Sequence, residues 1–173
     1  MNLHLQKIFE RAYAENTDAL FRFVLYRVSD KEQAIDIIED AYLRFWETLR
    51  KEKVGKPRAL LYKIARNLII DWYKKKKSIT IPTLVDENSE NSQIYLDMFE
   101  GNLIGVDVVL EAKLAIEKIA SLESIYREVV YLRYVEELTP KEIAEILGES
   151  TNVISVRINR GLRLLKSALH VEQ

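Results

Sequence analysis

Apolar residues recur three and four positions apart along most of the chain, which is the spacing of helices that bury one face. In residues 34–49 the apolar face is formed by Ile35, Ile38, Tyr42, Phe45 and Leu49. An earlier helix ends near Val28 and is marked by Leu20, Phe21, Val24, Leu25 and Val28. Strand-like alternation is missing, and Gly and Pro are scarce, so the pattern predicts an all-α fold.

Local signals place the ends of these helices. Ser29 followed by Glu32 predicts a capping box that opens the second helix. The stretch KVGKP predicts a turn, and a third helix should run from Arg58 to Lys75. On that helix the expected core positions are Leu61, Ile64, Leu68 and Trp72.

The helical period is lost in the middle of the chain. Residues 78–106 contain Pro82, Gly101, Gly105 and the run DENSENS, which are typical of a flexible linker. The sequence therefore predicts two small helical domains, residues 1–77 and 107–173, joined by this tether. An apolar cluster at 94–99 is unusual for a pure spacer, and we expect part of it to dock as a short helix.

Charge is divided between the same three segments. Residues 1–80 carry 17 Lys/Arg and 11 Asp/Glu, residues 81–110 carry 6 acids and no Lys/Arg, and residues 111–173 carry 9 basic and 10 acidic side chains. Within Arg50–Lys77, 11 basic residues face only Glu52 and Asp71. The net charge of −1 is therefore the sum of a basic first domain, an acidic linker and a nearly neutral second domain.

Composition narrows the function classes. The chain has no Cys, so disulfides and thiolate metal sites are excluded. No apolar run approaches the ~20 residues that span a bilayer, and no signal peptide is evident, so we expect a cytoplasmic protein without a membrane partner. His4 and His170 lie near the ends, and no catalytic triad, phosphate loop or ligand cluster is found. We expect no enzyme activity, no metal and no cofactor.

The second domain contains the sharpest pattern, LTPKEIAEILGESTNVISVRINRGLRLLKSAL. Thr139, Pro140 and Glu142 form a helix start with a capping box, and Gly148 ends that helix. A second helix then begins at Ser150 or Thr151. Its inward positions are predicted to be Val153, Ile154, Ile158, Leu162 and Leu165, and its basic positions are Arg157, Arg160, Arg163 and Lys166. A helix-turn-helix that reads duplex DNA fits this pattern. An ordinary helix pair with a solvated basic stripe fits it too.

The third helix ends in DWYKKKK, two aromatic residues followed by four lysines. Exposed Tyr62 and Tyr73 could stack on bases of single-stranded nucleic acid while cations follow the phosphates. Lysines at a helix C-terminus are also favoured by the helix dipole alone, so the run does not by itself require a nucleic-acid partner.

In their order and spacing these segments resemble a bacterial RNA polymerase sigma factor of the extracytoplasmic-function, two-domain subfamily. The resemblance rests on AIDIIEDAYLRFW (Ala34–Trp46), LLYKIARNLIIDWYKKKK (Leu60–Lys77) and the region from Tyr126 to Lys166. It implies a transcription initiation factor that binds bacterial core RNA polymerase and promoter DNA, duplex and melted. Such factors often have an anti-sigma protein as a further partner.

The resemblance also implies roles for individual residues. The polymerase-binding face would comprise Asp36, Glu39, Asp40, Leu43, Arg44 and Glu47. The minus-ten element would be recognised and melted by Lys53, Lys56, Arg58, Lys63, Arg66, Asn67, Tyr73 and Lys74. The minus-thirty-five element would be read by Thr151, Asn152, Ser155, Val156, Arg157, Asn159 and Arg160.

This chain departs from the family pattern at several of these positions. Leu60 replaces a frequent Trp, Pro57 a frequent aromatic, and Glu39 the usual Gln. On the recognition helix Val153, Ser155 and Val156 stand where Thr, Lys or Arg, and Ser are common. Two alternatives to a sigma factor remain open on the residues alone: a helix-turn-helix regulator that binds only duplex DNA, and a helical protein-binding module that uses the acidic face of 36–47.

Overall fold

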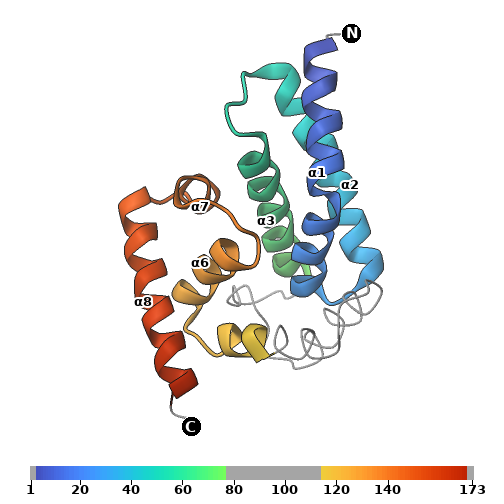
Figure 1. The fold of residues 1–173 in the computed structure, drawn as a ribbon. Helices are drawn as coiled ribbons and strands as arrows, with labels where there is room; N and C mark the ends of the chain where they lie inside the picture. The colour runs from blue at the N-terminus through green and yellow to red at the C-terminus, as the bar shows by residue number, and fades with distance from the viewer. Residues whose placement is uncertain (1–2, 77–113, 171–173) are drawn as a thin grey trace. The chain divides into compact units, whose positions relative to one another are not determined.

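The computed structural model describes residues 3–76 and 114–170, and the predicted linker at 78–106 lies outside these ranges. Helices account for most of the described residues (Figure 1), which confirms the all-α prediction. The chain divides into two compact units. The first contains α1 (Leu3–Val28), α2 (Lys31–Lys51) and α3 (Pro57–Lys76). The second contains α6 (Ser124–Tyr134), the start of α7 (Pro140–Leu147) and α8 (Thr151–His170).

The three helices of the first unit all pack against one another. Their fully buried side chains come from every helix and include Leu20, Phe23, Phe45, Leu61, Tyr62 and Ile69. Burial of a side chain of this size contributes about 1.5–3 kcal/mol to stability. Ile35, predicted to face this core, is instead 40% exposed, whereas Ile37, two positions later, is buried. Helix α2 touches two neighbours, so its buried arc is wider than the predicted stripe and extends to Ala34, Ile37 and Ala41.

The corner between α1 and α2 differs from the predicted capping box. Ser29 has a φ of 55°, and its N–H donates to the carbonyl oxygen of Leu25 at 2.8 Å, which ends α1. Asp30 is the residue that caps α2, because its Oδ1 accepts from the N–H groups of Glu32 and Gln33 at 3.0 and 3.1 Å. The prediction of Ser29 as the cap was wrong by one residue, since Ser29 is already used to turn the chain.

In the second unit, helices α6 and α8 pack together at a small residue. A Cβ built on Gly161 would lie 2.6 Å from Cγ2 of Val130 and 3.3 Å from Cβ of Tyr126, so the glycine lets the two helices approach closely. Ile154 and Ile158 are buried as predicted, but Val153 is 37% exposed. Leu162 and Leu165 are half-buried. Helix α8 therefore buries one narrow side.

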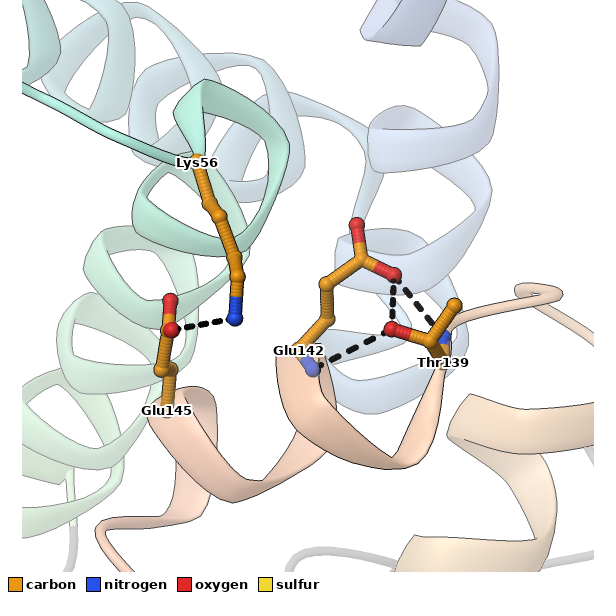
Figure 2. Close-up of polar contacts among 4 residues, drawn as sticks. All are labelled: Lys56, Thr139, Glu142 and Glu145. Atoms are coloured by element: carbon orange, nitrogen blue, oxygen red, sulfur yellow. Dashed lines mark hydrogen bonds and ion pairs between the residues drawn. The ribbon is translucent and has the colours of Figure 1, made fainter. Parts of the chain in front are cut away.

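The start of α7 and the turn between α7 and α8 have the predicted capping interactions. Thr139 and Glu142 form a reciprocal capping box (Figure 2): the N–H of Thr139 donates to Oε2 of Glu142 at 2.8 Å, and the N–H of Glu142 donates to Oγ1 of Thr139 at 3.3 Å. Gly148 has a φ of 71°, and the next N–H, from Glu149, donates to the carbonyl oxygen of Ala144. Oγ of Ser150 then accepts from Val153 at 3.3 Å and opens α8.

Candidate polymerase and nucleic-acid interfaces

The predicted polymerase-binding residues lie together on the outer side of α2. Asp36, Glu39, Leu43, Arg44 and Glu47 are exposed, and Asp40 is half-exposed. Leu43 is 65% exposed, so this charged face also contains an apolar side chain. Asp40 holds the guanidinium of Arg44 in two contacts, at 3.2 Å to Oδ1 and 3.0 Å to Oδ2. The face thus combines fixed charges with one apolar side chain.

A groove that was not predicted runs beside this face, between α1 and α2. It has a volume of about 700 Å³ and is lined by Gln6, Phe9, Glu10, Tyr13, Ile38, Glu39, Tyr42, Leu43 and Trp46. The rings of Phe9 and Trp46 meet edge to face, with centroids 5.4 Å apart. Glu39 and Leu43 belong both to this groove and to the predicted polymerase-binding face. The sequence did contain a signal for this groove: Phe9 and Tyr13 are aromatic residues one turn apart on the first helix. It was missed because the apolar residues of that helix were all expected to face the core.

One hydroxyl in the groove has a shifted pKa. Burial raises the pKa of Tyr42, and its hydrogen bond with Thr17, at 2.9 Å between the two oxygens, opposes that rise. The Tyr42 hydroxyl is therefore neutral at physiological pH and fixes α1 against α2.

The predicted minus-ten residues divide into two groups. Lys53 is exposed before α3, and Lys56 and Arg58 are half-exposed at its start. Along α3 the exposed side chains of Lys63, Asn67 and Lys74 fall on one line, because these positions are separated by whole turns. Arg66 is half-exposed beside them. An amide and cations thus share one surface of the helix.

Tyr73 does not belong to that surface, and neither does Tyr62. Tyr73 is 7% exposed, and its hydroxyl donates to the backbone oxygen of Arg27. Tyr62 is fully buried, with its ring edge to face against Phe23. The expectation that these rings are exposed to receive bases was wrong, because α3 contacts both α1 and α2 and little of its circumference is left for solvent.

The ring that does reach the surface of α3 is Trp72, which was predicted to be core. Its Nε1 donates to Oε1 of Gln33 at 2.8 Å, and Nζ of Lys76 lies 4.6 Å from the ring centroid. A second groove, of about 450 Å³, lies beside it between α2 and α3. Its lining is Asp36, Ile37, Asp40, Arg44, Leu68, Asp71, Trp72, Lys74 and Lys75.

Helix α8 presents the predicted minus-thirty-five residues unequally. Asn152, Val156, Asn159 and Arg160 are exposed, whereas Thr151, Ser155 and Arg157 are half-exposed. The Ser155 hydroxyl donates to the backbone oxygen of Thr151 at 2.9 Å. Nη2 of Arg157 pairs with Oε1 of Glu149 at 3.1 Å, so this arginine is drawn toward the turn.

Comparisons with known proteins place both units in one family. Residues 12–79 match Sigma-70 region 2, and residues 113–165 match Sigma-70, region 4. The chain is 28% identical over 156 residues to the ECF RNA polymerase sigma factor SigW of Bacillus subtilis. The aligned region covers 88% of this chain and 83% of SigW. It is 27% identical over 161 residues to the ECF RNA polymerase sigma factor SigL of Mycobacterium tuberculosis, with 91% and 86% covered.

A solved structure shares the fold. The sigma factor RpoE from Bartonella quintana, crystallised with the anti-sigma factor NepR, aligns with a TM-score of 0.62 and 19% identity over 95% of this chain and 98% of that chain. The chain belongs to the RNA polymerase sigma factors, in the extracytoplasmic-function group. It is a transcription initiation factor that binds core RNA polymerase and directs it to promoters. None of the helices in residues 3–76 and 114–170 is long and apolar enough to cross a membrane.

Proposed function

We propose that the two units divide promoter recognition between them. Residues 1–77 bind core polymerase and hold the melted minus-ten element, residues 107–173 read the minus-thirty-five element as duplex, and residues 78–106 connect them. The observation that carries the proposal is the pair of family matches, region 2 followed by region 4, on two separate compact units.

The outer side of α2 is the proposed polymerase contact. Its support is the exposure of Leu43 beside Glu39 and Glu47, and the aromatic groove that continues the surface onto α1. An apolar centre with a charged rim is the usual anatomy of a protein–protein interface. We therefore extend the predicted face to include Phe9 and Tyr13 at the groove.

The line of Lys63, Asn67 and Lys74 on α3 is the proposed path of the melted strand. Cations that follow phosphates supply most of the affinity for single strands, and an aromatic ring adds stacking of about 1–3 kcal/mol per base. Because Tyr73 is buried, the stacking role passes to Trp72, which is half-exposed beside Lys74 and Lys75.

Helix α8 is the proposed reader of duplex DNA. It follows the capped helix α7 and the Gly148 turn, the arrangement that sets a recognition helix in the major groove. Arg160 and Arg163 are exposed and available to phosphates or guanine edges.

Reconstituted transcription tests the proposal. The full chain is added to bacterial core polymerase and a library of promoter-bearing DNA, and initiated transcripts are sequenced. We expect transcripts only when both proteins are present. A chain that binds duplex DNA without core and starts no transcript would be a duplex-only regulator, which would refute the proposal.

A charge reversal tests the polymerase contact. Asp36→Arg with Asp40→Arg should lower affinity for core polymerase at least 100-fold, because a patch of negative charge and its pair with Arg44 are lost. The matched control, Glu15→Arg with Asp18→Arg, makes the same charge change on exposed positions of α1. Equal affinities for the two double variants would show that the contact lies elsewhere.

An anti-sigma protein is the proposed regulatory partner. The Bartonella quintana sigma factor of the same fold is in complex with one. Such a partner would compete with polymerase for the groove and the outer side of α2, and competition between the two is measurable with a labelled chain.

A further inference from the structure

The exposed side of α8 contains a stripe of five residues with an apolar side chain among them. At about 100° per residue, positions 152, 156, 159, 160 and 163 fall within an arc of about 100° around the helix axis. All five side chains are exposed. The buried residues Ile154, Ile158 and Gly161 lie on the opposite side, against α6. The stripe is therefore the surface that would face a bound duplex.

Short side chains occupy the centre of this stripe. Val156 is 50% exposed and lies between Asn152, one turn earlier, and Asn159, one turn later. The nearby hydroxyl of Ser155 is engaged with the backbone oxygen of Thr151. The Arg157 guanidinium is held by Glu149 at 3.1 Å. The long cationic side chains of the stripe, Arg160 and Arg163, are both C-terminal to Val156.

This chemistry matches one kind of base pair. In the major groove the thymine C5 methyl is the apolar feature of the base edges, and a Val side chain can bury it. The amide of Asn is suited to adenine, whose N7 accepts and whose N6 amino group donates. Guanine is best read by Arg or Lys, which this stripe offers only C-terminal to Val156.

We infer that the centre of α8 reads A·T base pairs, with Val156 packed on a thymine methyl group and Asn152 or Asn159 paired with adenine. This inference rests on the proposed function, in which α8 enters the major groove. It assigns Val156 as a specificity-determining residue and gives the class of sequence that the second unit selects.

Removal of single methyl groups tests the inference. The full chain, assembled with bacterial core polymerase, is used to select duplexes from a random library, and thymines in the selected upstream element are replaced one at a time by uracil. We expect one replacement to weaken binding about fourfold, the effect of exposing one buried methyl-sized group. Val156→Ala should weaken binding to the thymine duplex by a similar factor and make it insensitive to that replacement.

Further variants give the controls. Val156→Thr retains a methyl group and should stay sensitive to uracil. Asn152→Ala with Asn159→Ala should lose at least about tenfold, with the preference for adenine relaxed. Leu164→Ala removes an apolar side chain that is 46% exposed outside the stripe and should change nothing.

Two results would contradict these proposals: the first refutes only the inference about A·T pairs, and the second also refutes the proposed function of α8. If uracil is tolerated at every position, or if the selected elements are read at G·C pairs in the centre, the inference is wrong while the docking of α8 stands. If Arg160→Ala with Arg163→Ala also leaves duplex binding unchanged, α8 is not the DNA-binding helix, and the proposed function of the second unit fails with it.

Discussion

Helices α3 and α8 have the same length and carry similar sequence cues, yet they expose different kinds of side chain. Each has 20 residues and a row of basic residues. Helix α3 contacts both α1 and α2, and its tyrosines are buried, so its remaining surface consists mainly of basic side chains, Asn67, Asp71 and one half-exposed indole. Helix α8 packs on α6, and nearly half its circumference is open. The number of packing partners thus decides which side chains each helix leaves exposed.

Truncation of a buried ring should give the largest effect. Tyr62→Ala leaves a cavity between α3 and α1 and should lower the free energy of unfolding of the first unit by about 3–5 kcal/mol. Urea unfolding followed by tryptophan fluorescence is selective, because both tryptophans, Trp46 and Trp72, belong to that unit. Tyr13→Ala, at a position 51% exposed on α1, should lower the stability of the same unit far less. Similar losses in both variants would mean that Tyr62 is not core.

Overpacking the α6–α8 contact should cost less. In Gly161→Ala the new methyl meets Val130 and Tyr126, and a forced fit of this kind typically costs about 1–3 kcal/mol. Hydrogen exchange of the α6 and α8 amides measures the stability of this unit. Adding Val130→Ala opens space at the clash, so the Gly161→Ala substitution should cost less in that background than alone. Additive losses would show that the close approach does not limit the packing.

Variants of Tyr73 and Lys74 distinguish a residue that stabilises α3 from one that is proposed to contact DNA. Tyr73→Phe loses the hydrogen bond to the Arg27 carbonyl and should cost about 1 kcal/mol of stability, with promoter opening unchanged. Lys74→Ala should leave stability nearly unchanged and reduce the salt dependence of single-strand binding by a log–log slope of about 0.7. Permanganate reactivity of melted thymines measures opening. A promoter-opening defect in folded Tyr73→Phe would show that the Tyr73 hydroxyl takes part in opening.

The smallest expected effect concerns the pair at the start of α8. Glu149→Gln releases Arg157 at a cost of about 0.2–1 kcal/mol in stability, as for other partly exposed pairs. Affinity for arbitrary duplexes should rise a few-fold, and the log–log salt slope should steepen by up to about 0.9, because Arg157 becomes free to contact a phosphate. Glu117→Gln makes the same charge change at an exposed site outside α8 and should have neither effect. An unchanged slope in Glu149→Gln would mean that Arg157 stays away from the DNA.

Features encoded by a few neighbouring residues could be predicted from the sequence. The capping box of Thr139 and Glu142 and the helix stop at Gly148 depend on local backbone chemistry, and both are present as expected. The corner at Ser29 and Asp30 was ambiguous, because two adjacent residues could each cap a helix.

Features that depend on distant partners were less predictable. Tyr62, Tyr73 and Ile35 were assigned to the wrong sides of their helices, since the buried arc of α2 or α3 depends on two neighbours at once. The pair of Glu149 with Arg157 spans the helix start, so the spacing rules for contacts within a helix do not anticipate it. The α1–α2 groove requires aromatic residues from two helices, and no single segment revealed it.

The corner at Ser29 has a consequence for how this protein can vary. A serine in left-handed backbone carries a steric cost that glycine avoids and that asparagine tolerates better. Substitutions at position 29 should therefore drift toward these two residues. Length is constrained too, because the corner has only two residues: Ser29 ends α1 and Asp30 caps α2, so an inserted residue would separate these two roles. Substitutions at this corner should therefore be tolerated better than insertions.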